Sequence, residues 1–160
     1  MDWTVGVALL VGLPAAMYSE LFAHELGHAV PILLAGGRAH VTVGNPDGRT
    51  VGLGRLKVTA GVDGLKNTFL YGYVDWADVE SRRLRALGLV CGPLVTVTLL
   101  IATGVLLLDR PDGLLSDVLL FLFLWLLNRS FYTIVPRTYS GGPYDGTTSD
   151  GRKLLELLRS

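Results

Sequence analysis

The sequence predicts an α-helical integral membrane protein, with three transmembrane helices and a small β-rich insert between the first and the second. Half of the 160 residues are hydrophobic, and the apolar residues are gathered in long blocks. Such blocks are typical of membrane spans, because a helix needs about 20 consecutive apolar residues to cross a bilayer. A chain of 160 residues is also short enough for one domain, which we place at 1–160.

The first apolar block covers about residues 3–34 and is longer than a bilayer requires. Pro14 and Pro31 mark expected kinks or ends. Glu20 is the first charged residue after Asp2. No cleavable signal sequence is expected, since the first residues lack a basic region and cleavage after the block would remove this helix.

The segment 36–78 is much more polar and predicts a small β layer at the membrane surface. An Asn-Pro-Asp-Gly turn at 45–48 separates two candidate strands, 40–43 and 50–59, which predicts a hairpin. A third candidate strand covers 68–76. His40 is interpreted as an ordinary strand residue, because a Gly-Gly break separates it from the first helix.

The second and third spans are predicted at 86–108, which carries no charge, and at 114–134. Gly92 and Pro93 near the start of the second span are expected to kink it or to let it approach the first helix closely. A Gly-rich loop and a short amphipathic helix at 152–159 are expected to close the chain.

The basic residues predict the orientation in the membrane. Of the 14 Lys and Arg residues, only Arg110 lies between the second and third spans. The positive-inside rule then places the N-terminus outside and the C-terminus in the cytoplasm, and we expect the plasma membrane. The lipid bilayer is therefore an expected partner. The net charge is zero, so no nucleic-acid partner is expected.

The first helix carries the pattern HExxH as His24, Glu25 and His28. At 100° per residue the two histidines lie about 40° apart on the helix surface, so one tetrahedral zinc ion can bind both. Glu25 lies beside this position and suits a base that acts on metal-bound water. The pattern arises by chance in many proteins, but three ionisable residues in an apolar helix are costly without a function. Glu20 lies one turn before His24 on the same helical face. It can contact that metal ligand without binding the metal itself, or it can line a water-filled cavity.

Two histidines and a water leave one protein ligand to be found. The positions at which soluble zinc proteases supply a third histidine hold Pro31 and Leu34 in this sequence. We therefore expect a carboxylate that the third span brings near. Asp145 and Asp150 are the candidates.

These features together resemble the site-2 protease family of intramembrane zinc metalloproteases, peptidase family M50. The shared features are HELGH in the first span, a β-rich insert, a Gly-Pro in the second span, and a third span that leads through a proline to Ser-Asp-Gly. The resemblance covers nearly the whole chain. It implies a Zn2+-dependent protease that hydrolyses peptide bonds of membrane-protein substrates near the cytoplasmic face, in regulated intramembrane proteolysis.

In that family, Asn-x-x-Pro followed by Asp-Gly supplies an aspartate as the third zinc ligand. Residues 133–136 match the first part with Thr133 in place of asparagine, and Ser149 to Gly151 match the second part through Asp150. Thr133 and the nearby Asn128 are the candidate substrate-binding residues. Asp150 is preferred over Asp145 on local grounds too, because it opens the last helix, whose N–H groups can orient its carboxylate. Asp145 has the surroundings of a turn residue that bonds its own backbone.

Two other functions remain open at this point. The chain could be a catalytically inactive membrane scaffold or chaperone-like binder of the same fold, or a protein that stores or transports metal. An inactive relative would tolerate loss of Glu25, which this sequence retains together with both histidines. A transporter needs a polar route across the bilayer, and 86–108 offers only threonines. The motif therefore favours the protease.

Overall fold

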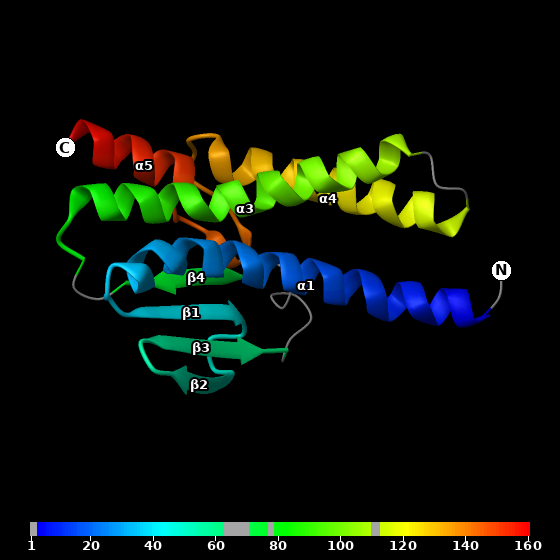
Figure 1. Ribbon diagram of the computed structural model, residues 1–160, viewed down its shortest axis with the longest axis horizontal. Coiled ribbons are helices and arrows are strands. Elements are labelled where there is room, and N and C mark those ends of the chain that lie inside the picture. Colours follow the sequence, from blue (N-terminus) through cyan, green and yellow to red (C-terminus); the bar gives the residue numbers. More distant parts are fainter. Residues whose placement is uncertain (1–2, 63–70, 77–78, 110–112) are drawn as a thin grey trace.

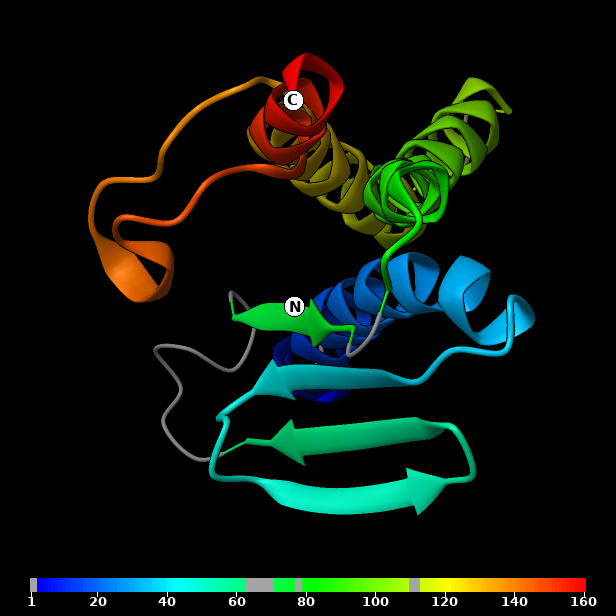
Figure 2. The same cartoon turned by 90° about the vertical axis from the view of Figure 1, so that its left-hand side faces the viewer.

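The architecture is mixed α/β, with four α-helices and a four-stranded sheet in the described part of the chain. The computed structural model describes residues 3–62, 71–76, 79–109 and 113–160. Helix α1 (Trp3–Leu34) lies between two layers (Figure 1). The sheet covers one side of α1. The other side faces α3 (Arg82–Leu108), α4 (Leu114–Ile134) and α5 (Asp150–Arg159), as the turned view also shows (Figure 2).

The helices follow the apolar blocks of the sequence. Pro14 and Pro31 both lie inside α1, and neither ends it. The second helix begins at Arg82, where the Ser81 side chain accepts a hydrogen bond from the Leu84 N–H at 3.4 Å. The third occupies 114–134, as expected. The last helix begins at Asp150, two residues before the expected start.

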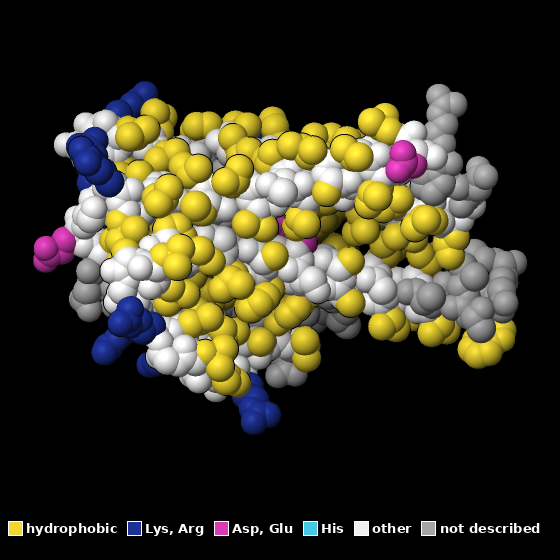
Figure 3. Space-filling view, in the orientation of Figure 1, with side chains coloured by type: hydrophobic (Ala, Val, Ile, Leu, Met, Phe, Trp, Pro, Cys, Tyr) yellow, Lys and Arg dark blue, Asp and Glu magenta, His cyan; other side chains and the backbone are white. Residues whose placement is uncertain are grey.

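Helices α3 and α4 are each long and apolar enough to cross a membrane. Many of their large apolar side chains face outward, among them Leu94, Ile101, Val105, Leu120 and Leu124. The space-filling view shows hydrophobic side chains over the helices, while Lys and Arg gather at the C-terminal end and beside the sheet (Figure 3). Apolar surface of this extent is uncommon on a water-soluble monomer and favours association with a membrane.

The strands are β1 (Ala39–Gly44), β2 (Arg49–Leu53), β3 (Leu56–Gly61) and β4 (Gly72–Asp75), and their order in the sheet is β2-β3-β1-β4. The hairpin expected between 40–43 and 50–59 is wrong. The chain turns at Gly54, whose φ is 64°, so 50–59 divides into β2 and β3, which pair with each other. A glycine at positive φ permits the tight two-residue turn that the twist of a hairpin requires.

Strand β1 instead pairs with β3 in parallel and with β4 in antiparallel orientation. Its central position explains its composition, because Val41 and Val43 are fully buried. Strand β4 confirms the second half of the third candidate strand, whereas 68–70 lie outside the described residues. His40 lies in β1 and bonds the Thr59 hydroxyl at 2.8 Å, as befits an ordinary strand residue.

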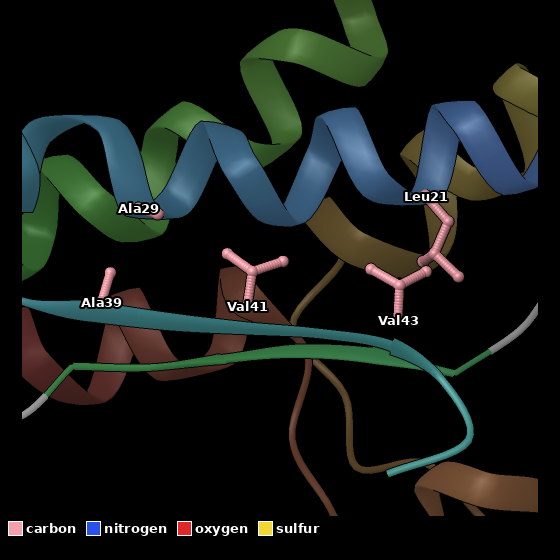
Figure 4. Packing of buried hydrophobic residues seen from close by; sticks show 5 residues of the cluster. All are labelled: Leu21, Ala29, Ala39, Val41 and Val43. Carbon is pink, nitrogen blue, oxygen red and sulfur yellow. The ribbon is translucent and has the colours of Figure 1, made fainter. Parts of the chain in front are cut away.

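The hydrophobic core joins the second half of α1 to β1. Leu21 and Ala29 project from α1 toward Ala39, Val41 and Val43, and all five are buried (Figure 4). Burial of apolar surface contributes about 25 cal/mol for each Å2, so this contact orients α1 relative to the sheet. The second half of α1 is thereby enclosed, with the sheet on one side and helices on the other.

Glycines allow α1 and α3 to approach closely. A Cβ atom at Gly27 would lie 2.9 Å from both the Cys91 carbonyl oxygen and Val95 Cγ2. A Cβ atom at Gly92 would overlap the imidazole of His28. The close approach expected from Gly92 is therefore present, and Gly27 serves helix packing.

Candidate metal centre

His24, His28 and Asp150 converge on one point, although the aspartate lies far from the histidines in the sequence. Oδ2 of Asp150 is 3.4 Å from His24 Nε2 and 3.3 Å from His28 Nε2. The two Nε2 atoms are 3.2 Å apart. Both histidines are buried, and all three residues lie close enough to hold one metal ion.

Each imidazole is oriented through its Nδ1 atom. His28 Nδ1 lies 2.8 Å from the Gly88 carbonyl oxygen, which can only accept, so Nδ1 carries the proton. His24 Nδ1 lies 2.8 Å from the Thr96 hydroxyl, and that hydroxyl donates to Glu20 Oε1 at 2.8 Å. The Thr96 oxygen therefore accepts from His24. In both rings the Nε2 lone pair is left for the shared point.

The charge at this point requires a cation. Burial acts to raise the pKa of Asp150, but the two imidazoles that face its carboxylate outweigh burial and hold the pKa well below its usual value. When both imidazoles are neutral, their Nε2 lone pairs and the ionised Asp150 oxygen repel one another unless a cation lies among them. Protons or a metal ion can fill that role, and two imidazoles with a carboxylate form a common metal-binding donor set. The residues present therefore fit a metal ion.

The N-terminus of α5 holds Asp150 in place. The Ser149 hydroxyl caps this helix by accepting from the Arg152 N–H at 3.2 Å, and it donates to the Val135 carbonyl at 2.9 Å. The second contact fastens the start of α5 to the end of α4. Asp145 lies apart from the cluster, and its Oδ1 accepts from the Gly141 N–H at 2.7 Å within the same loop.

Glu25 lies beside the cluster in a cleft of about 1460 Å3. The cleft is also lined by His24, His28, Asp150 and the whole of β4. Glu25 is 5% exposed, and a Cβ atom at Gly72 would lie only 2.8 Å from its Oε1. Gly72 thus leaves room for the carboxylate, and the carboxylate lies next to β4 and the candidate metal ligands.

The two candidate substrate-binding residues, Asn128 and Thr133, also line the cleft. The Thr133 hydroxyl donates to the Arg129 carbonyl at 3.0 Å, and Ser130 O lies 3.3 Å from it. This hydroxyl is therefore turned toward its own helix, while the Asn128 side chain has no such contact among the described hydrogen bonds. A substrate role for either residue stays a prediction.

Tyr144 connects the loop before α5 to β4. Its hydroxyl donates to the Gly72 carbonyl at 2.8 Å and accepts from the Gly72 N–H at 2.6 Å. Burial, followed by the charge of Glu25, raises the pKa of Tyr144 above its usual value. Burial, followed by the charge of Asp150, raises the pKa of Tyr139 to about 12. Both phenols therefore stay protonated at neutral pH, and Tyr144 can donate and accept at once.

Sequence reasoning missed three features of this site. Two of them are the contact of Thr96 with His24 and the hydrogen bonds of Tyr144 with Gly72. The third is an ion pair, in which Arg129 Nε lies 3.4 Å from Glu20 Oε2. The ion pair left a signal in the sequence. Opposite charges within two apolar helices are costly to insert unless they pair, so Glu20 and Arg129 were candidates for contact.

Comparison of the chain with protein-family profiles, with curated proteins and with solved structures gives no match.

The geometry predicts different effects for the two loop aspartates. Asp150→Asn should weaken binding of Zn2+ by more than about 100-fold, since loss of contacts behind a ligand alone costs about 10- to 100-fold. Asp145→Asn should leave it unchanged. Zinc affinity of the purified variants, measured by competition with a chromogenic chelator, tests this. Native affinity in Asp150→Asn would exclude the site described here.

Proposed function

We propose that this chain is an intramembrane zinc metalloprotease, similar to the site-2 protease family, that cleaves transmembrane substrates near the cytoplasmic face. The observation that carries the proposal is the convergence of His24, His28 and Asp150 beside Glu25 in one cleft. A buried acid next to a convergent set of metal-binding donors is the arrangement that metal-assisted hydrolysis needs. The motif alone supplies only three of these four residues.

The spacing of the donor atoms supports zinc. Ligands of a tetrahedral ion with bonds of about 2.0–2.1 Å lie about 3.3–3.4 Å from one another. The three separations among the Nε2 and Oδ2 atoms are 3.2, 3.3 and 3.4 Å. Three protein ligands would leave the fourth position open, as catalytic zinc sites require.

The chemistry is divided between the ion and Glu25. When bound, zinc would polarise the scissile carbonyl and lower the pKa of a water molecule. Glu25 accepts a proton as the water oxygen attacks the carbonyl carbon. It then delivers the proton to the nitrogen as the C–N bond breaks. Burial of Glu25 at 5% exposure keeps bulk water away from this transfer.

Strand β4 offers a template for the substrate. A transmembrane helix hides its carbonyl groups in its own hydrogen bonds, so it must unwind before cleavage. Strand β4 is at the edge of the sheet and lines the cleft beside Glu25. An extended segment can pair with this edge by strand addition, which brings its carbonyls toward the metal ligands.

The same edge is blocked at Gly72, where the Tyr144 hydroxyl occupies both backbone groups. The Trp76 indole also donates to the Val74 carbonyl at 2.9 Å. Successive outward-facing groups of an edge strand are two residues apart, so Tyr144 and Trp76 cap two adjacent positions. A substrate strand must replace the bond of Tyr144 in order to pair at Gly72.

Tyr144→Phe should therefore lower KM by about 2- to 10-fold, because a hydrogen bond contributes about 0.5–1.5 kcal/mol net. Tyr139→Phe is the matched control, since its hydroxyl donates to the Tyr132 carbonyl and not to β4. Cleavage of a model transmembrane peptide in detergent measures both. A raised KM in Tyr144→Phe would mean that the hydroxyl binds substrate instead of excluding it.

Glu25→Gln tests the reaction itself. The amide keeps the shape of the side chain but cannot accept the proton, so kcat should fall by about 100- to 10,000-fold while bound zinc is retained. Asp47→Asn, at an exposed turn, should behave as the native chain. Cleavage of the same peptide and zinc content are the two measurements. Near-native cleavage by Glu25→Gln would refute the protease and leave the scaffold interpretation.

The proposed topology has three spans, with the N-terminus outside. The start of α1 supports a first span, because Trp3, Leu10 and Val11 are exposed apolar residues. Cysteines introduced as Asp2→Cys and Ser160→Cys, each in a Cys91→Ala background, should react with an impermeant maleimide from opposite sides of the membrane. Labelling of the first only from the cytoplasm would reverse the orientation.

A further inference from the structure

Glu20 and Thr96 form a buried hydrogen-bond chain behind His24. Glu20 is 6% exposed and Thr96 is fully buried. Among the described residues that line the cleft, neither of them occurs. Their contact with the candidate metal ligands is through His24. Glu20 lies one helical turn before His24 on α1, whereas Thr96 comes from α3.

The donor and acceptor in each of these hydrogen bonds follow from the chemistry of the groups. A carboxylate can only accept, so the single hydroxyl proton of Thr96 goes to Glu20 Oε1, at 2.8 Å. The Thr96 oxygen is then an acceptor for His24 Nδ1, also at 2.8 Å. A proton on Nδ1 leaves the Nε2 lone pair free and turned toward Asp150. The chain thus selects both the tautomer and the orientation that a metal ligand needs.

Arg129 supplies the charge that keeps Glu20 in this place. Its Nε lies 3.4 Å from Glu20 Oε2, and its side chain is 12% exposed. A buried carboxylate without a partner would be strongly destabilising, so the arginine of α4 balances the acid of α1. The chain then links three helices at one point behind the site.

The two histidines differ in how they are held. His28 is oriented by a backbone carbonyl, that of Gly88, which no substitution removes. Within the described part of the chain, His24 Nδ1 is oriented by the Thr96 side chain, which in turn bonds Glu20. Only at His24 can the orienting contact be deleted without changing a ligand.

We propose that Glu20 and Thr96 are positioning residues for His24, and that Arg129 holds Glu20 in the orientation this requires. These hydrogen bonds raise metal affinity because they hold His24 in one tautomer and one rotamer, with Nε2 free, before the ion binds. The inference rests on the metal site of the proposed function, but it does not depend on peptide hydrolysis.

The test uses the full chain in detergent and two readouts, zinc affinity by chelator competition and the visible absorption spectrum with Co2+. Thr96→Val keeps the shape of the side chain but removes the hydroxyl. It should weaken zinc binding by about 10- to 100-fold and alter the cobalt spectrum, because the His24 ring is no longer fixed. Thr96→Ser, which keeps the hydroxyl, should restore near-native affinity and spectrum.

Thr98→Val is the matched control, since Thr98 lies on the same helix and its hydroxyl donates to the Leu94 carbonyl in an exposed position. It should bind zinc as the native chain does. Glu20→Gln should also weaken binding. Because Glu20 acts through Thr96, the double variant Glu20→Gln with Thr96→Val should lose little more affinity than Thr96→Val alone.

Native affinity and spectrum in Thr96→Val would overturn the proposal, as would fully additive losses in the double variant. Should Thr96→Val fail to fold, as judged by its helical content, a loss above tenfold in Thr96→Ser would overturn it equally. If the native chain binds zinc with these variant effects but cleaves no peptide, the positioning role stands and the protease does not. A native chain that binds neither ion would overturn both.

Discussion

The close contact of α1 with α3 is the constraint on which the rest of the site depends. Gly27 and Gly92 carry no side chains that would hold the helices apart, so the His28 ring fits directly against the α3 backbone. At this distance the Gly88 carbonyl reaches His28 Nδ1. One turn nearer the start of α1, the Thr96 side chain of α3 reaches His24 Nδ1. Both imidazoles are oriented by α3, and they can be oriented only because the helices approach so closely.

The charges within this interior are balanced in pairs or sets. Asp150 faces two imidazoles, and Glu20 faces Arg129. Removing a charge from water costs several kcal/mol even in real proteins, so each of these contacts must form together with the fold. The two sets are also connected, since Thr96 bonds both Glu20 and His24. The site is therefore one network that spans α1, α3, α4 and α5.

The sheet contributes in a different way. Strand β1 anchors α1 through the apolar core, whereas β4 lies at the edge and faces the cleft. Gly72 of β4 has two functions. Its lack of a side chain leaves room for Glu25, and its backbone groups bind the Tyr144 hydroxyl. An edge strand with unpaired backbone groups attracts other chains, and a side-chain hydroxyl at that edge limits such pairing.

The sequence by itself determined several local features of this protein: the long apolar helices, the Asn-Pro-Asp-Gly turn at 45–48, and the placement of His24 and His28 on one helical face. These follow from contacts between residues no more than a few positions apart, for which helix geometry suffices. It misjudged the pairing of β1, because the register of a sheet depends on strands that meet only after folding. It narrowed the third ligand to two aspartates and favoured Asp150, yet only the tertiary structure brings that residue to the histidines. Thr96 lies 72 positions from His24, and no spacing rule links them. Such contacts are decided by how the helices pack.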